Sequence, residues 1–265
     1  MPRGVNDFDT GRIQGRNAGN ANSSNIVSPG IVTDGLVLHL DAGNYQSYPI
    51  AGATWYDLSD RRNNGTLTNN PTYVRDGGGA ISLDGTNDFV SLPDVSGVTD
   101  FTISDNYTVD FWVYINSTQN NQLQNDNFLV EKWDTAFAPG YPFVFRYIRT
   151  GTGSPCVHVA VYNGTSAQFA SASVSTDTWI NYCGVFDWKA SLLSVYRNAG
   201  APNATTTINL TGTITNASNV YLGSRGTSTS GLFTGSFGSL KIYNRALSQP
   251  EVQQNFNATR ARFNI

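Results

Sequence analysis

Few residues in this chain could carry out acid or base catalysis. The sequence has only two glutamates, Glu131 and Glu251. A glycosidase needs two carboxylates about 5–9 Å apart on either side of one bond, and Glu131 with Asp134 is the only pair that suggests such a site. Residues three apart at the end of a strand point to opposite faces. We therefore expect no catalysis from this pair.

Histidine and cysteine add little further chemistry. His39 and His158 are the only histidines, which is too few for a histidine metal site or a nucleophile with its base. Cys156 and Cys183 do not form a CxxC pair, and we interpret them as thiols buried in strands. The sequence contains no Walker loop, HExxH, nucleophile elbow or Gly-x-Gly-x-x-Gly motif. These observations predict a protein that is not an enzyme and has no cofactor.

The residues best suited to binding lie on one predicted strand, 107–115, which reads YTVDFWVYI. Its alternation gives one apolar face and one mixed face carrying Asp110, Trp112 and Tyr114. Aromatic rings beside a hydrogen-bond acceptor are what a sugar ring stacks on, so these three residues form a candidate glycan site. The alternative is that Trp112 and Tyr114 pack under a loop or under the carboxy-terminal helix.

A second pair of aromatic residues, Trp133 and Tyr141, could line the same face. Tyr141 falls in the segment 138–142, which reads APGYP and predicts a loop. No spacing argument places the pair beside Trp112, so its location stays open.

Composition excludes several classes of partner. Only 13% of the 265 residues are charged, the net charge is −3 and the pI is about 5.2. The chain therefore has no basic field to hold nucleic acid or an anionic membrane. No run reaches the length of about 20 apolar residues needed to cross a bilayer. The polar amino terminus has no apolar segment typical of a secretory signal, so we expect folding in a cytoplasm.

The strand pattern predicts an all-β sandwich over residues 35–247. About ten short apolar stretches recur at roughly ten-residue spacing and are separated by Gly, Asn and Pro turns. Residues 1–34 contain too few apolar side chains to fold alone and predict an extended arm. If that arm docks on a partner, Phe8 and Ile13 would anchor it, with Arg12 and Arg16 beside them. A frayed tail is the alternative.

Residues 248–265 predict a short helix followed by a tail. Ser248 and Glu251 have the spacing of a capping box. Apolar and small residues then recur on one helical stripe, which comprises Val252, Phe256, Thr259 and Phe263. The tail predicts either a partner contact or a frayed end.

Several motifs resemble those of laminin G-like, concanavalin A-like jelly rolls. They are Trp55-Tyr-Asp-Leu-Ser, Asn63-Asn-Gly-Thr-Leu, Ala80-Ile-Ser-Leu-Asp-Gly-Thr-Asn-Asp-Phe-Val and the closing Ile242-Tyr-Asn-Arg-Ala-Leu-Ser. The resemblance covers residues 35–248 and implies a concanavalin A-like jelly-roll β-sandwich. That fold includes lectins and glycan-cleaving enzymes. The Glu-x-Asp-x-Glu strand of the glucanase branch is absent here.

The same resemblance raises the question of calcium. Asp57 and Asp84 match the acidic loops that hold Ca²⁺ in many such domains. However, Arg61 and Arg62 stand where small residues are usual, and Ser239 replaces an acidic residue. Both changes weaken a divalent site. We predict no metal residues, and leave calcium as the open alternative.

The wider pattern is similar to laminin G-like structural proteins of tailed bacteriophages, notably those of cyanobacteria. The matching stretches are GLVLHLDAGN at 35–44, YNRALS at 243–248 and QNFNATRARF at 254–263. This resemblance implies a virion protein, expected to decorate or cement the capsid and docked on capsid or other virion proteins through its arm. Whether it forms a homo-oligomer stays open. The alternative function is a tail or fibre adhesin that recognises a host surface glycan. The position in the particle stays open.

Overall fold

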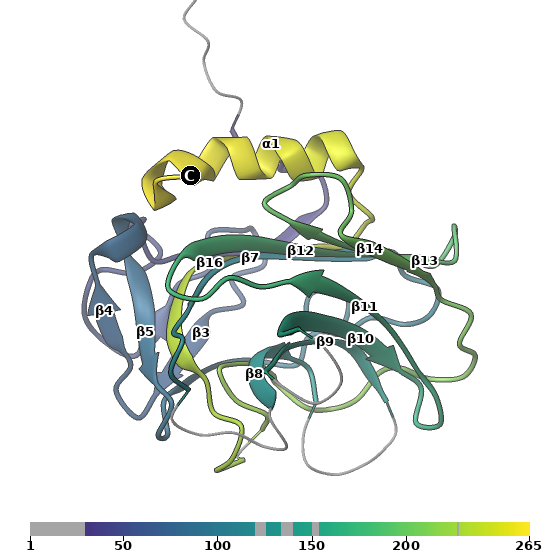
Figure 1. Cartoon of the computed structure of the whole chain (residues 1–265), viewed down its shortest axis with the longest axis horizontal. Helices are drawn as coiled ribbons and strands as arrows, with labels where there is room; N and C mark the ends of the chain where they lie inside the picture. The colour runs from purple at the N-terminus through teal and green to yellow at the C-terminus, as the bar shows by residue number, and fades with distance from the viewer. Residues whose placement is uncertain (1–29, 120–125, 134–139, 150–153, 227) are drawn as a thin grey trace, which may run out of the picture.

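The computed structural model describes residues 30–119, 126–133, 140–149, 154–226 and 228–265. Two antiparallel β-sheets of eight strands each pack face to face within these ranges, and a single α-helix lies across the outer face of one sheet (Figure 1). This architecture confirms the predicted all-β sandwich with a short carboxy-terminal helix, and it agrees with a concanavalin A-like jelly roll.

Sheet A carries the helix. Its strands lie in the order β14-β13-β12-β7-β16-β5-β4. Strand β1 pairs with the carboxy-terminal half of β16. Their bounds are β14 Ala204–Thr207, β13 Leu192–Arg197, β12 Trp179–Asp187, β7 Tyr107–Ile115, β16 Thr234–Tyr243, β5 Ala80–Asp84, β4 Thr72–Val74 and β1 Leu36–Asp41.

Sheet B forms the second layer. Its order is β11-β10-β9-β8-β15-β6-β3-β2. The bounds are β11 Ala167–Ser173, β10 Cys156–Tyr162, β9 Tyr141–Ile148, β8 Asp126–Glu131, β15 Val220–Leu222, β6 Phe89–Leu92, β3 Gly65–Thr68 and β2 Thr54–Trp55. A short 3₁₀ helix, η1, spans Asp76–Gly78.

The apolar core lies between the sheets because the strands alternate inward and outward side chains. On β7, Val109, Phe111 and Val113 enter this core. Strand β7 pairs with β12 on one side and β16 on the other, so the prediction that 107–115 is a central strand is confirmed. The residues between them face away from the core, toward the helix.

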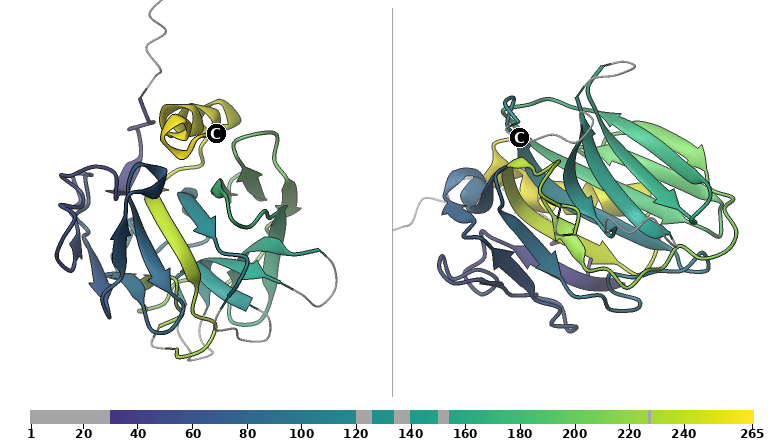
Figure 2. Two further views of the ribbon diagram at one scale, coloured as in Figure 1. Left: turned by 60° about the vertical axis from the view of Figure 1, so that its left-hand side comes forward. Right: turned by 90° about the horizontal axis from the view of Figure 1, so that it is seen from below.

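Helix α1, Gln249–Thr259, forms a third layer and continues into the 3₁₀ helix η2, Arg260–Phe263. Figure 2 shows α1 end-on against sheet A. The predicted capping box is present, and Val252, Phe256 and Phe263 are buried. The predicted stripe is thus confirmed. The apolar side chains of the tail contact the chain's own sandwich.

The last residues of the predicted arm are fixed against this layer. The Val32 amide donates to Asn255 Oδ1 at 2.8 Å, and the Tyr243 hydroxyl donates to the Val32 carbonyl at 3.0 Å. Gln254 Nε2 donates to the Gly30 carbonyl at 2.8 Å. Residues 30–34 therefore run beside α1 toward sheet A, on the side of the molecule away from sheet B (Figure 1).

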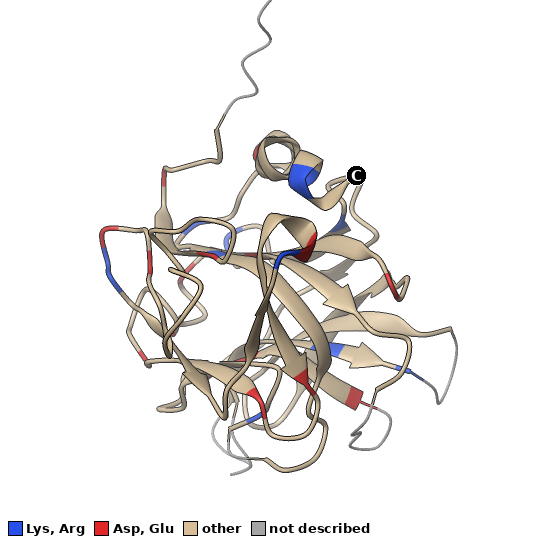
Figure 3. Cartoon of the chain, turned by 90° about the vertical axis from the view of Figure 1, so that its left-hand side faces the viewer, with Lys and Arg blue, Asp and Glu red and all other residues tan. Residues whose placement is uncertain are grey.

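Charged side chains are sparse. Figure 3 shows Lys and Arg positions interspersed with Asp and Glu positions and no large region of one sign. In the described part of the chain, no helix is long and apolar enough to span a bilayer.

One local prediction was wrong. Tyr141 and Pro142 lie at the start of strand β9 rather than in a loop. Proline is tolerated there because the pairing with β10 is irregular between Ala160 and Tyr162, so no ladder hydrogen bond is lost at that point. The consequence is that Tyr141 belongs to sheet B, and not to the face that carries Trp112.

Candidate functional site

The predicted platform around Trp112 is covered by the carboxy-terminal helix. Trp112 is fully buried, and its ring stacks on Phe256 and Phe263 with centroids 5.5 and 4.1 Å apart. Its Nε1 donates to Thr259 Oγ1 at 2.9 Å. Tyr114 is half-buried and packs edge-on against Trp179 at 5.7 Å. A sugar could stack on Trp112 only if α1 moved away.

Asp110 is equally inaccessible. Its carboxylate accepts hydrogen bonds from Asn181 Nδ2 at 2.7 Å and from Asn255 Nδ2, on α1, at 3.2 Å. Lys241 Nζ lies 3.4 Å away and is buried as well. The open platform expected from Asp110, Trp112 and Tyr114 is therefore replaced by a packed interface, as in the alternative interpretation of the sequence.

The other predicted residues contribute no site in the described structure. Phe8, Arg12, Ile13 and Arg16 lie outside the described residues, as does Asp134. Within the described ranges, no group of three His, Cys, Asp or Glu side chains could hold a metal ion.

Asp57 does not fit the calcium role considered above. Its two carboxylate oxygens accept four hydrogen bonds, from the amides of His39, Ser59 and Asn63 and from the Ser59 hydroxyl. The distances are 2.7–2.9 Å. A carboxylate already satisfied by donors organises its loop and is a poor ligand for a cation.

The outer face of sheet B carries a cluster of polar and aromatic side chains. At its centre, Glu131 is fully buried between two arginines. Arg146 Nε donates to Glu131 Oε1 at 2.6 Å, and Arg225 Nε donates to Oε2 at 2.7 Å. Both carboxylate oxygens are therefore engaged in charge-assisted hydrogen bonds.

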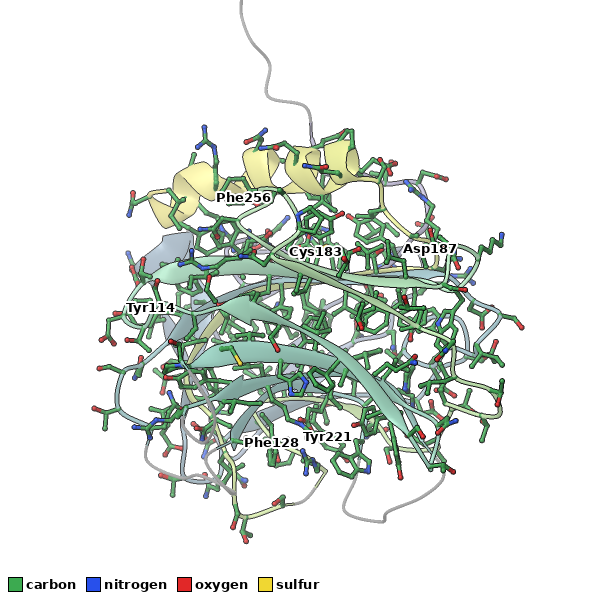
Figure 4. The ribbon with its side chains drawn as sticks, turned by 45° about the vertical axis from the view of Figure 1, so that its right-hand side comes forward. Tyr114, Phe128, Cys183, Asp187, Tyr221 and Phe256 are labelled. Carbon is green, nitrogen blue, oxygen red and sulfur yellow. The ribbon has the colours of Figure 1, made fainter. Side chains whose placement is uncertain are left out.

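Aromatic rings surround these ion pairs. The Arg225 guanidinium lies 3.9 Å from the centroid of the Trp133 ring and 4.0 Å from that of Phe128. The Arg146 guanidinium lies 5.0 Å from the Trp133 centroid. Such cation–π contacts fix both the rings and the cations. Figure 4 shows the labelled Phe128 on the sheet B side of the molecule, opposite Phe256 of α1.

A row of three rings continues from Trp133. Tyr141 lies 5.1 Å from Trp133, and Tyr162 lies 5.3 Å from Tyr141, measured between centroids. Trp133 and Tyr162 are half-buried, whereas Tyr141 is 6% exposed. The rings pack together on the outside of the sheet, separate from the main core.

Strand register places the remaining members of this surface. Val144 pairs with Ala160, and Ala160 pairs with Phe169 on β11. His158 pairs with Arg146, and its ring meets Phe169 edge-on at 4.3 Å. We call this surface the aromatic face, which comprises Trp133, Tyr141, Val144, Arg146, His158, Ala160, Tyr162 and Phe169.

The aromatic face has an exposed edge and unused donors. Phe169 is 55% exposed, an unusual position for a phenylalanine. Arg146 Nη2 and His158 Nε2 are buried and have no hydrogen-bond partner among the described residues. Burial and the Arg146 charge lower the pKa of His158 to about 4. At neutral pH its uncharged ring can donate or accept one further hydrogen bond.

The pKa values of the arginine and tyrosine on this face follow from their burial and partners. Burial opposes the charge of Arg146, but the Glu131 carboxylate more than compensates and raises the pKa of Arg146. Burial raises the pKa of Tyr141. Arg146 therefore stays cationic and Tyr141 stays a neutral phenol across the physiological range.

Sequence reasoning missed most of this surface, although part of it had a signal. Val157, Val159 and Val161 alternate in the core on β10. That period of two placed His158 and Tyr162 together on the other face. Arg225 lies outside any strand and gave no such signal.

The chain that carries the aromatic face is similar to known proteins. A family profile named Laminin_G_3, described as the concanavalin A-like lectin/glucanases superfamily, matches residues 84–253. A search of curated proteins found no match.

Several solved structures are similar. The binding domain of Paraclostridial Mosquitocidal Protein 1 has a TM-score of 0.64 and 16% identity over 84% of this chain and 52% of that one. The binding domain of botulinum neurotoxin DC in complex with SialylT has a TM-score of 0.63 and 13% identity over 85% and 52%. This chain thus spans about half the length of these two.

The third similar structure is matched over nearly its full length. Domain 4 of AbnA, a GH43 extracellular arabinanase from Geobacillus stearothermophilus in complex with arabinotriose, has a TM-score of 0.57 and 18% identity. The match covers 83% of this chain and 97% of that domain. At these identities the likeness establishes a shared fold.

Proposed function

Because the chain belongs to the concanavalin A-like lectin/glucanases superfamily, we propose that it is a non-catalytic domain that binds carbohydrate through its aromatic face. The observation that carries this proposal is the row of rings beside Arg146 and His158, whose buried Nη2 and Nε2 atoms have no hydrogen-bond partner among the described residues. A buried donor without a partner is costly. A hydroxyl-bearing ligand would supply the missing acceptors.

The chemistry of the face suits a sugar. One side of a pyranose or furanose ring is apolar and stacks on aromatic rings, and its edge carries hydroxyl groups that bond to polar side chains. Phe169 and Tyr162 offer accessible ring surface at the outer strands. His158 shares β10 with Tyr162, and Arg146 on β9 lies between β10 and Glu131 on β8. Two similar domains were solved with an oligosaccharide or SialylT, which supports the same class of ligand.

The hydrogen bonds that Glu131 accepts support a binding role rather than a hydrolytic one. Glycoside hydrolysis needs one carboxyl group that can transfer a proton and a second that acts as base or nucleophile. Both oxygens of Glu131 already accept hydrogen bonds from arginines. We expect no oligosaccharide turnover, and Glu131→Gln should weaken the folded state rather than abolish an activity.

The test is a glycan array followed by titration of the best oligosaccharide. We expect saturable binding that Phe169→Ala weakens about tenfold, because one stacked ring is worth on the order of 1 kcal/mol. Phe169 is 55% exposed, so its removal should leave the fold intact. Tyr45→Ala, at a 70% exposed tyrosine before β2, is the matched control and should bind like wild type.

Two results would contradict the proposal. One is saturable binding that is unchanged by both Phe169→Ala and Tyr162→Ala. The other is an array that shows no binding to any glycan while thermal melting confirms that the protein is folded.

The virion structural role is a second candidate. The position of Gly30 favours it: the first described residue lies at α1, on the side opposite the aromatic face (Figure 1). A partner that held residues 1–29 would leave the aromatic face pointing outward. Docking on a capsid and recognition of a host glycan are therefore geometrically compatible.

A further inference from the structure

A cavity lined mainly by residues of sheet B and its loops lies away from the aromatic face. It has a volume of about 490 Å³. Five of its nine lining residues are serine or threonine, namely Ser117, Ser154, Ser173, Ser175 and Thr176. Their hydroxyl groups offer many donors and acceptors, while Tyr147, Pro155 and Val174 add apolar surface. Such a lining suits a ligand that is rich in hydroxyl groups and also has an apolar ring face.

The cavity also has an excess of positive charge. Arg149 is part of its lining. Arg197 Nη2 donates to Ser175 Oγ at 2.8 Å, and Arg197 Nε is buried with no hydrogen-bond partner among the described residues. Asp177 is a carboxylate beside this lining and accepts from the Ser117 amide at 2.9 Å. Two guanidinium groups and one carboxylate thus lie in or next to the described lining.

The bond from Arg197 prepares Ser175 to donate. The Ser175 oxygen accepts from a cation, so its own hydrogen is free to point toward another acceptor. A hydroxyl polarised in this way is a stronger donor than an isolated one. Arg149 can meet the same acceptor from the lining with its planar pair of N–H groups.

Tyr147 adds a neutral phenol to the lining. Burial raises its pKa, the Arg149 guanidinium opposes that rise, and Asp177 adds to it. The phenol therefore keeps its proton at neutral pH and adds no negative charge that would repel an anion.

We propose that this cavity binds a sugar acid, with the carboxylate on Arg149 and Ser175 and the ring hydroxyls on the surrounding serine and threonine side chains. The ligand class follows from the lining, which combines a guanidinium for a planar carboxylate with hydroxyl groups for a polyol. A simple oxyanion such as sulfate would bind the guanidinium but would leave the hydroxyl groups for the polyol unused.

The cavity is distinct from the aromatic face. Tyr147 belongs to the main core, whereas its neighbour Arg146 points to the outside of sheet B. Val174, Ser175 and Thr176 follow the end of β11, beyond the strand that carries Phe169. A ligand here would leave the aromatic face open, so the two proposals stand or fall separately.

The test compares methyl β-glucuronide with methyl β-glucoside, which differ in the carboxylate alone. Both would be titrated into the ¹⁵N-labelled full chain and followed by amide shifts. We expect saturable shifts at Ser175 and Thr176 with the glucuronide, and affinity at least about tenfold weaker for the glucoside, since a charge-assisted bond contributes roughly 1.5–3 kcal/mol.

Variants locate the site. Arg149→Gln should weaken glucuronide binding about tenfold. Arg75→Gln removes the same charge from an exposed position before η1 and should bind like wild type. Phe169→Ala, on the aromatic face, should leave the glucuronide shifts unchanged even if it abolishes binding of other glycans.

The inference is overturned if the two glycosides bind equally, if neither shifts the amides of Ser175 and Thr176, or if Arg75→Gln weakens binding as much as Arg149→Gln. Sodium sulfate that shifts the same amides as strongly as the glucuronide at equal ionic strength would show a general oxyanion site and would also overturn it. The wild-type comparison stands even if Arg149→Gln fails to fold.

Discussion

Trp112 shows that a tryptophan on an outward strand face can pack against a helix rather than bind a sugar. An exposed tryptophan on a polar strand face suggests that a sugar stacks on it. In this structure the rings of Phe256 and Phe263 stack on Trp112 instead. The ring therefore stabilises the contact between α1 and sheet A. Its loss would leave a cavity in a close-packed interface.

We predict that Trp112→Ala lowers the free energy of unfolding by about 3–5 kcal/mol. The cost combines lost burial with the cavity that remains. Urea unfolding measured by circular dichroism would test it, with Phe169→Ala as the control that should change stability by less than about 0.5 kcal/mol. A Trp112→Ala protein as stable as wild type would show that α1 does not pack on this ring.

His39 is a buried residue whose ionisation should affect the pH dependence of stability. Burial, reinforced by the Lys241 charge, lowers the pKa of His39 from 6.5 to about 4. The folded state therefore holds this imidazole neutral, and the unfolded chain binds the proton first as pH falls. The stability that it contributes is fully present above pH 6.5 and is lost as pH falls toward about 4.

We expect the wild type to lose more stability than His39→Gln between pH 7 and pH 4.5, with a difference on the order of 2 kcal/mol. Parallel urea titrations at both pH values would measure it. Asp100→Asn is an informative control, because burial raises the pKa of Asp100 to about 6 and its contribution runs in the opposite direction. Identical pH profiles for wild type and His39→Gln would contradict the prediction.

At the scale of elements, the start of α1 is held more firmly than a capping box requires. Glu251 accepts from the Ser248 amide at 2.8 Å and also from two Arg245 nitrogens, at 3.0 and 2.7 Å. Hydrogen bonds from Arg245 are the main cause that lowers the pKa of Glu251 to about 2. Arg245 in turn contacts Asp34 at 2.8 Å. The Arg245 guanidinium, just after the closing strand, thus joins Glu251 of the helix to Asp34.

Glu251→Gln should therefore cost about 1 kcal/mol at pH 7, a modest figure because the pair is partly exposed to solvent. The lowered pKa means that this stability is present above pH 4.5 and is lost as pH falls through about 2. Thermal melts of wild type and variant should converge as the pH approaches 2. A constant difference across that range would show that the charge is not involved.

At the scale of the whole molecule, the amino-terminal arm was predicted to span residues 1–34. Its described residues, 30–34, are held against the sandwich, because Gly30 and Val32 bond to α1. Removing residues 1–33 would take away part of this packing. A test of the arm has to stop at residue 29.

We predict that a chain lacking residues 1–29 melts within about 2 °C of the full chain, whereas one lacking residues 1–33 melts at a lower temperature. The reason is the loss of the bonds that Val32 makes to Asn255 and Tyr243. If the virion proposal holds, the shorter deletion should also fail to join phage particles. Particles that incorporate it as well as the full chain would refute docking through the arm.

The sequence alone determined the fold class and the central elements. The period of two in 107–115 marked a central strand, and the Ser248–Glu251 spacing marked the start of the helix. These are local patterns, because the side chains of a strand or helix follow the backbone period whatever lies beyond them.

Only the tertiary structure decided which polar face stays open. The strand period places Trp112 and His158 equally well on outward faces, yet α1 covers the first and leaves the second beside the exposed Phe169. The cavity lined by Arg149 and Ser175 likewise joins segments from different strands. Burial depends on contacts between residues far apart in the chain, and the sequence by itself does not carry that information in any local pattern.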